Sequence, residues 1–329
     1  MFGNLINFQD FKSAFRLASK SEFRRLHRML FGRRETRVRE AWTRLANPES
    51  GMWEVPAVQA RWRRMVTGND RVGFYDHFFS KYMNGQIPRV LSLACGPGET
   101  EIRIAKTGSV RRIDGYDISR ERIDFATARS REEGVAEIAF FHVADVLKAE
   151  IREDSYDVVL AEGALHHFTP LHAVYDKIFR ALKGGGYLVI NDFVGPTRFQ
   201  WTDRQLEAAN SILRALPARY RTRRDGTPKP EIFRPSRLSM IVGDPSEAVD
   251  SSGILSKVRK RFEVVEERGY GGAILHILLA GIAHNFLGQD SETESVLRAI
   301  FAFEDALMSS GEIDSDYIFA VFRPREPQA

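Results

Sequence analysis

Short apolar runs alternate with segments of helical periodicity over much of the chain. The clearest apolar run covers residues 89–94 and ends in glycines, and a helical pattern follows over 99–107. Strands that alternate with helices are typical of a parallel α/β sheet covered on both faces. The alternation predicts seven strands, at 89–94, 112–117, 138–143, 156–161, 187–191, 262–268 and 317–322.

Two regions depart from this alternation. Residues 1–84 have only helical patterns and are predicted to form an N-terminal arm and lid ahead of a main domain at 85–329. Residues 196–256 are rich in Arg, Pro and Ser, and we interpret them as an insertion that caps the carboxyl edge of the sheet. The helices predicted outside the strand–helix alternation are 8–30, 35–45, 58–65, 71–82, 203–216, 274–287 and 291–310.

The composition is typical of a globular protein that needs no disulfide bonds to stabilise its fold. Of the 329 residues, 43% are hydrophobic, enough for a sizeable core. Cys95 is the single cysteine, which excludes an internal disulfide and a multi-cysteine zinc site. We therefore expect a reducing, cytoplasmic location. The N-terminus has no continuous apolar signal segment, and the apolar run at 274–280 is too short to span a bilayer.

The positive charge is concentrated at the N-terminus. The whole chain carries +4, whereas residues 1–50 hold 11 Lys/Arg and 5 Asp/Glu, so the remainder carries about −2 (4 minus 6). The main domain is therefore not a basic surface for nucleic acid, and we expect no nucleic-acid partner. The arginines of the arm could form a solvated face, or they could contact anionic lipid or a lipid-linked acceptor.

A glycine loop follows the first predicted strand, in the sequence LACGPG (93–98). Gly96 and Gly98 let the backbone turn sharply and approach a ligand, and the following helix points its amide groups at the same place. Dinucleotide-binding folds use a similar loop, but position 101 is Glu101 where their third glycine would stand. Asp117 ends the second strand, nineteen residues after Gly98, where it could bind ribose hydroxyls or cap the next helix.

The next two strands also end in polar residues. Asp145 and Val146 follow the third strand, and Glu162, His166 and His167 follow the fourth. The carboxyl ends of strands are where open α/β sheets bind ligands. Asp145 taken alone could be an ordinary loop acid. Its place at the carboxyl edge of the sheet also suits hydrogen bonding to the adenine amino group of a nucleotide-like ligand.

Together these stretches resemble the class I S-adenosylmethionine-dependent methyltransferases. The matching segments are VLSLACGPGETE (90–101), DGYDIS (114–119), VADV (143–146), YDVVLAEGALHHF (156–168) and LKGGGYLVINDF (182–193). The resemblance covers about 85–325 and is specific for fold and cofactor, but not for substrate. It implies a Rossmann-like seven-stranded sheet with six parallel strands and the last strand, 317–322, antiparallel beside the sixth.

The resemblance also implies how S-adenosylmethionine would be bound as cofactor. Gly96 and Gly98 would line its methionine part, Asp117 would bind the ribose, and Asp145 with Val146 would hold the adenine. One departure is Ser92, where many members carry an acid inside the first strand. The full set of predicted cofactor contacts is Ala94, Gly96, Gly98, Asp117, Ile118, Asp145, Val146, Ala161, Glu162 and Tyr75.

Tyr75 belongs to a predicted helix that often closes over the cofactor in this family, although it could equally be part of an aromatic core stripe. The candidate catalytic residues are His167, His166 and Glu162. A neutral histidine is a natural base for a hydroxyl acceptor. Adjacent histidines in a turn face different ways, so we expect one to meet the substrate, with His167 preferred, and either could instead support the following helix.

No metal site is predicted, because His276 and His284 of the predicted helix 274–287 have no further ligands in sight. They are expected to line the core or a pocket. The expected function is methyl transfer to a small or medium-sized acceptor, most simply a hydroxyl of a specialised metabolite or saccharide. The saccharide and natural-product branch is suggested by SMIVGDPSEA (239–248) and FEVVEERGYGG (262–272).

Three alternatives remain open. The first two are N-methylation and C-methylation of a natural product, either of which could proceed without a histidine base. The third is a non-catalytic S-adenosylmethionine-binding scaffold that holds a partner or membrane through the basic arm. A homodimer is also left open as an oligomeric state.

Overall fold

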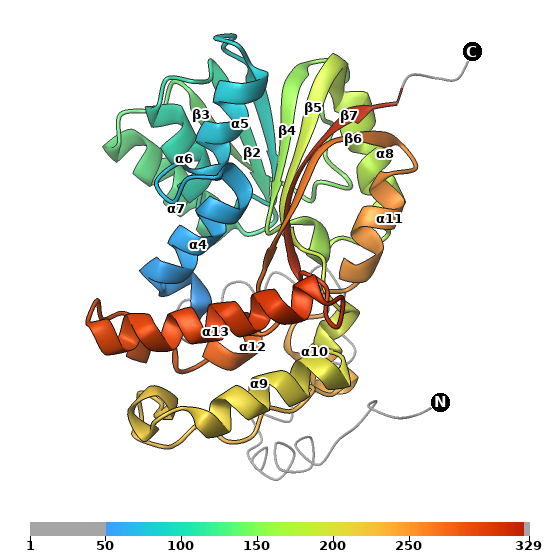
Figure 1. Cartoon of the computed structure of the whole chain (residues 1–329). Coiled ribbons are helices and arrows are strands. Elements are labelled where there is room, and N and C mark those ends of the chain that lie inside the picture. The colour runs from blue at the N-terminus through green and yellow to red at the C-terminus, as the bar shows by residue number, and fades with distance from the viewer. Residues whose placement is uncertain (1–50, 326–329) are drawn as a thin grey trace, which may run out of the picture.

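A computed structural model describes residues 51–325 (Figure 1). The two helices predicted at 8–30 and 35–45 lie outside the described residues, and so does the basic arm that they form. Within the described part of the chain, no helix has both the length and the apolar character needed to cross a membrane.

One seven-stranded sheet organises the described residues, in the order β3-β2-β1-β4-β5-β7-β6. β1 to β5 pair in parallel, while β7 lies antiparallel between β5 and β6. The predicted α/β, Rossmann-like sheet is confirmed, including the antiparallel last strand beside the sixth. The strands are β1 (Arg89–Leu93), β2 (Arg112–Asp117), β3 (Ala139–Val143), β4 (Tyr156–Glu162), β5 (Leu182–Phe193), β6 (Phe262–Gly271) and β7 (Tyr317–Pro324).

The two faces of the sheet are buried in separate cores. Val90 of β1 packs in one core with Phe78 and Ile102, whereas the next residue, Leu91, packs in the other with Val174. This alternation follows from the two-residue period of a strand, and burial on both faces explains why the central strands are almost wholly apolar. The helices are α4 (Pro56–Thr67), α5 (Phe74–Tyr82), α6 (Glu99–Lys106), α7 (Arg120–Glu132), α8 (Leu171–Ala181), α9 (Asp203–Ala215), α10 (Arg237–Gly243), α11 (Ile254–Val258), α12 (Leu275–Leu279) and α13 (Ser291–Ser309).

A group of helices lies beyond one edge of the sheet. Figure 1 shows α9, α10, α12 and α13 below the sheet, at the end where the parallel strands finish, and α12 contacts α9. α9 begins with a capping box, in which the Thr202 side chain accepts from the backbone N–H of Gln205 and Gln205 accepts in return. Part of this group comes from the predicted insertion at 196–256.

Two predicted boundaries are wrong. β5 begins at Leu182, directly after α8 and ahead of the predicted strand start at 187, so the glycines at 184–186 lie inside the strand. The predicted helix 274–287 is broken, because Gly281 has φ +74° and the Lys229 ammonium binds the carbonyls of Ile277, Leu278 and Ala280.

Because of this break, His276 and His284 do not lie on one helix, contrary to the predicted helix 274–287. His276 belongs to α12, where the Tyr317 hydroxyl lies 3.1 Å from its Nδ1, and His284 belongs to a separate 3-10 turn, Ala283–Phe286.

Candidate functional site

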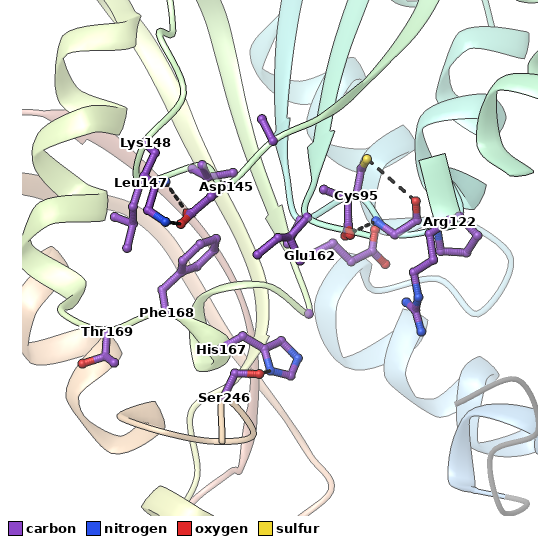
Figure 2. A pocket seen from close by; sticks show the side chains of 18 residues that line it. Cys95, Arg122, Asp145, Leu147, Lys148, Glu162, His167, Phe168, Thr169 and Ser246 are labelled. Carbon is purple, nitrogen blue, oxygen red and sulfur yellow. Dashed lines mark hydrogen bonds and ion pairs between the residues drawn. The ribbon is translucent and has the colours of Figure 1, made fainter. Parts of the chain in front are cut away.

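A cavity of about 560 Å³ opens at the carboxyl edge of the sheet (Figure 2). It is built by the loops after β1, β2, β3 and β4, together with a residue that follows α10. The lining residues are Ala94, Cys95, Gly96, Pro97, Asp117, Ile118, Arg122, Ala144, Asp145, Val146, Leu147, Lys148, Glu162, Gly163, His167, Phe168, Thr169 and Ser246. Segments far apart in the sequence therefore share one space.

The glycine loop forms one wall of the cavity. Gly96 has φ +54° and Gly98 has φ +74°, a left-handed backbone that side chains rarely adopt. A Cβ atom on Gly98 would lie 2.6 Å from the Phe141 ring, so the loop could not pack as it does with any other residue there. Gly98 shapes the loop and is not among the lining residues, and its contact with a cofactor stays a prediction.

Asp117 ties the glycine loop to the start of α7. Its Oδ2 accepts from the Gly96 N–H at 3.0 Å, and its Oδ1 accepts from the Ser119 N–H at 2.7 Å. Ser119 is the N-cap of α7, so the alternative that Asp117 caps this helix is wrong. Burial raises the pKa of Asp117, against the hydrogen bonds from Ser119 and Gly96. Asp117 thus presents a nearly buried carboxyl to the cavity.

The loop after β3 forms a second wall of the cavity, and hydrogen bonds from α8 stabilise it. Asp145 Oδ1 accepts from the Leu147 N–H at 2.9 Å, which closes a tight turn. The Lys177 ammonium of α8 donates to the carbonyls of Val146, Leu147 and Ala149 at 2.6–3.0 Å. One cation therefore fixes the backbone that lines this side of the cavity.

Glu162, at the end of β4, reaches the cavity between these two walls (Figure 2). Its Oε1 accepts from Asn191 Nδ2 at 3.5 Å, while its Oε2 is buried and has no hydrogen-bond partner among residues 51–325. Two predicted neighbours do not line the cavity: Ala161 is fully buried in the sheet, and Tyr75 is only 2% exposed. Tyr75 packs in the core, as the aromatic-stripe alternative predicts, and its contact with a cofactor stays a prediction.

His166 is bound away from the cavity. Its Nδ1 lies 2.5 Å from Asp192 Oδ1, and Asp192 Oδ2 accepts from the backbone N–H groups of Ala164 and Leu165. Burial lowers the pKa of His166, but Asp192 and then Glu247 outweigh it, so that pKa is raised overall. His166 does not line the cavity, and its catalytic role stays a prediction.

His167 lines the cavity, and Figure 2 shows its ring beside Ser246. The Ser246 hydroxyl lies 3.4 Å from His167 Nδ1, and the His167 ring centroid is 3.9 Å from that of His166. Burial and the neighbouring His166 lower the pKa of His167 well below the usual value of 6.5. His167 is therefore neutral at pH 7 and can accept a proton from a group in the cavity.

The segment 244–250 brings Ser246 and Glu247 against the two histidines. Glu247 Oε1 lies 3.6 Å from His166 Nε2, and the Val249 N–H donates to the His166 carbonyl at 2.9 Å. The Arg198 guanidinium holds this segment by donating to the carbonyls of Asp244, Pro245 and Glu247. Arg198 has a left-handed backbone, with φ +58°, and its N–H donates to the Ala248 carbonyl.

His166, His167 and Glu247 could each offer one metal-ligand atom within 4.8 Å of the others. Two histidines and one carboxylate are a donor set that divalent transition metals accept. The sequence predicted no such site, because Glu247 comes from a segment about 80 residues later in the chain. His166 also links this group to Asp192, because its Nδ1 lies 2.5 Å from Asp192 Oδ1.

Sequence reasoning missed several lining residues. Cys95 lies inside the quoted glycine motif, and burial, then Glu101 and Asp117, raise the pKa of its thiol well above the usual range. Arg122 lies about one helical turn after the loop that begins at Asp117. That spacing could have identified Arg122 as a residue facing the same cavity. Ser246 lies in the SMIVGDPSEA stretch. That stretch suggested a branch of the family but did not predict that Ser246 would line the cavity.

The family described as "Methyltransferase domain" has a model that matches residues 88–232 of this chain. This segment contains β1 to β5 and most of the cavity lining. Ser246 falls beyond the match.

Two curated bacterial proteins are similar to part of this chain. A "27-O-demethylrifamycin SV methyltransferase" of Amycolatopsis mediterranei is 33% identical over 106 residues, which are 32% of this chain and 39% of that protein. "Methyltransferase GfsG" of Streptomyces halstedii is 32% identical over 107 residues, 32% of this chain and 38% of that protein. The chain thus spans well under half the length of each.

Among solved structures, a "Phosphoethanolamine N-methyltransferase 2" of Haemonchus contortus in complex with S-adenosyl-L-methionine matches with a TM-score of 0.48. The match has 15% identity and covers 88% of this chain and 60% of that one.

Proposed function

Since residues 88–232 form a domain of the class I S-adenosylmethionine-dependent methyltransferase family, we propose that this protein transfers a methyl group to a small-molecule acceptor. The observation that carries the proposal is that Asp117 and His167 line one cavity. A carboxyl suited to ribose hydroxyls and a neutral base suited to an acceptor proton thus share one space.

The residues present fit S-adenosylmethionine as the methyl donor. The left-handed glycine loop leaves backbone room beside Asp117, and Arg122 Nη1 is only 3.3 Å from where a Cβ on Gly96 would stand. Asp145 and Val146 lie along the wall proposed for the adenine. The buried, unpartnered Oε2 of Glu162 suits a positively charged group. The bound donor supplies an activated methyl on a sulfonium, so the protein needs chiefly to orient the reactants and exclude water.

The histidine pair would remove the acceptor's proton. Neutral His167 takes the proton as the oxygen–methyl bond forms. His166, held by Asp192, orients the neighbouring ring, and its protonated form lowers the pKa of His167. Ser246 contacts His167 Nδ1 and fixes the ring orientation.

The segment 196–256 would act as the cap that selects the acceptor. It supplies Ser246 to the cavity and Glu247 to His166. Similarity to a protein named "27-O-demethylrifamycin SV methyltransferase" supports a hydroxyl of a specialised metabolite, and a saccharide hydroxyl needs the same base.

The direct test is to incubate the purified full chain with methyl-labelled S-adenosylmethionine and a producer-cell extract, and to identify the labelled product by mass spectrometry. We expect one dominant labelled small molecule with the methyl on oxygen. A product methylated on nitrogen or carbon, with a pH–rate profile free of any ionisation, would exclude the hydroxyl assignment. Donor binding without any labelled product would favour a non-catalytic scaffold.

A further inference from the structure

Three carboxyl groups lie near the His166 ring. Asp192 Oδ1 is 2.5 Å from His166 Nδ1, and Glu247 Oε1 is 3.6 Å from His166 Nε2. Burial lowers the pKa of His166, but these two carboxylates and that of Asp244 raise it. Oδ2 of Asp244 is buried and has no hydrogen-bond partner among residues 51–325. Buried charges in proteins are paired or coordinate metals, so a bound cation suits this group of carboxyls.

The atoms that could bind a cation are close together. His166, His167 and Glu247 each offer one ligand atom, and the three atoms lie within 4.8 Å of one another. Ligand atoms at about 2.0–2.1 Å from a tetrahedral Zn²⁺ are separated by roughly 3.3 Å. His166 Nε2 and Glu247 Oε1 already stand 3.6 Å apart, so modest side-chain rotations complete the set. In catalytic zinc sites two histidines and one glutamate bind the metal and leave a fourth position open.

His166 also has the support that a ligating histidine needs. Such a histidine normally donates its second ring N–H to a carboxylate, which fixes the tautomer and the ring orientation. In this protein Nδ1 of His166 faces Asp192 and Nε2 stands beside Glu247. Asp192 Oδ2 is itself fixed by the backbone N–H groups of Ala164 and Leu165. The ligand set therefore has the hydrogen bonds of a built metal site.

We propose that His166, His167 and Glu247 form a binding site for Zn²⁺ and that bound Zn²⁺ stops methyl transfer. A neutral imidazole has one nitrogen lone pair. Whichever nitrogen of His167 binds the metal, no lone pair remains for the acceptor's proton. The binding site depends only on the three ligands, whereas the loss of turnover rests on the proposed function, in which His167 is the base.

The metal would join the cap to the sheet without touching the donor. Glu247 belongs to the segment 244–250, which the Arg198 guanidinium holds, whereas both histidines follow β4. The residues proposed to bind the donor, such as Asp117 and Asp145, are not among the ligands. Zn²⁺ should therefore lower kcat and leave the Kd for S-adenosylmethionine unchanged.

The binding test is calorimetric titration of the EDTA-treated and dialysed full chain with ZnCl₂. Glu247→Gln keeps the shape of the side chain but loses its charge, and it should weaken Zn²⁺ binding about hundredfold. The matched control is Glu231→Gln, an exposed carboxyl elsewhere in the cap, which should bind Zn²⁺ as the wild type does. Mg²⁺ prefers oxygen ligands and should not bind at this site. Equal Zn²⁺ affinity in the wild type and Glu247→Gln would overturn the site.

A second variant guards against a folding artefact. His167→Ala removes one of the three ligands and should also weaken Zn²⁺ binding about hundredfold. Its affinity for S-adenosylmethionine, measured on the same sample, should equal that of the wild type and so show that the protein is folded. Unchanged Zn²⁺ affinity in this folded variant would likewise overturn the site.

The functional test adds ZnCl₂ to the methyl-transfer reaction with the acceptor identified from the extract, and then removes it with EDTA. We expect wild-type kcat to fall about a hundredfold and to recover with EDTA. Each variant is compared with its own metal-free rate, and Glu247→Gln should need about a hundredfold more Zn²⁺ for the same fractional loss.

The two readouts separate the failure of each idea. Zn²⁺ bound at the site with full turnover would overturn the inhibition, and with it the role of His167 as base. Absence of any labelled product with the metal-free wild type would overturn the proposed function, and the Zn²⁺ affinities of the wild type and Glu247→Gln would still decide the site.

Discussion

The two ends of the cavity are built in different ways. The end formed by the glycine loop, Asp117 and Asp145 comes from three consecutive strand ends, and its groups are held by hydrogen bonds to nearby backbone. The end formed by His167 and Ser246 joins residues 79 positions apart in the chain. The first end follows from the sheet itself, whereas the second depends on how the cap packs against it.

This contrast predicts different effects for substitutions at the two ends. Changes at the sheet-built end should alter donor affinity and leave the chemical step intact, because the proposed function assigns those groups to the donor alone. Changes at the cap-built end should alter turnover and leave donor affinity intact. Any single substitution that altered both equally would break the distinction.

The largest effect is expected for His167→Ala. Removing a general base should lower kcat about a thousandfold while leaving the S-adenosylmethionine Kd unchanged, as measured by calorimetry and product formation. Since the pKa of His167 lies well below 6.5, wild-type turnover should be constant near pH 7 and fall only in more acidic solution.

Two controls accompany this variant. His172→Ala, an exposed histidine on α8, should keep full activity. Treatment with EDTA should leave the wild-type rate unchanged; a loss restored by a divalent cation would instead assign a catalytic metal to His166, His167 and Glu247.

The next largest effect is expected for Asp117→Ala. Loss of a carboxyl that accepts from the ribose hydroxyls should raise the Kd for S-adenosylmethionine about a hundredfold, with kcat at saturation within about threefold of wild type. Asp124→Ala, an exposed acid on α7, is the matched control and should bind normally. An unchanged Kd in Asp117→Ala would remove the ribose assignment.

A smaller effect is expected for Arg198→Lys. Lysine keeps the charge but cannot reach three carbonyls at once, so the segment 244–248 should shift and kcat should fall about tenfold with donor Kd unchanged. The control is Arg204→Lys, whose partners Glu207 and Glu312 are exposed. Normal turnover in Arg198→Lys would show that the cap does not position the base.

The smallest effect is expected for Lys177→Met. Without the ammonium, the three carbonyls of the loop after β3 lose their common donor, and the S-adenosylmethionine Kd should rise about threefold with kcat unchanged. Lys183→Met, which breaks only the ion pair with Asp157, should leave the Kd as in wild type. A fall in kcat for Lys177→Met would mean that the two ends are coupled.

The sequence predicted the sheet and most of the sheet-built end, because both depend on short-range signals. Alternating apolar runs define strands wherever a sheet is buried on both faces, and polar residues directly after such runs fall at one edge. Asp117 and Asp145 therefore line the cavity where they were expected. Tyr75 does not line the cavity. An aromatic residue near the start of a helix gives the same sequence pattern whether it packs in the core or faces a ligand.

The cap-built end could not be predicted to the same depth. Ser246 and Glu247 reach the histidines through a segment that the Arg198 side chain clamps, and no local pattern encodes a contact between residues 49 positions apart. The break after α12 was missed for a similar reason. It depends on Lys229, which lies about 50 residues before the carbonyls that it binds.

The position of Cys95 gives this protein a built-in reporter of occupancy. It is the single cysteine of the chain, it lines the cavity, and its thiol is held in the protonated, slowly reacting form. A maleimide or iodoacetamide can thus modify one site only, and anything seated against the glycine loop shields that sulfur. Compared with the rate for the ligand-free protein, the rate of thiol alkylation, followed by intact mass, gives the fraction of protein with an empty cavity without an engineered residue.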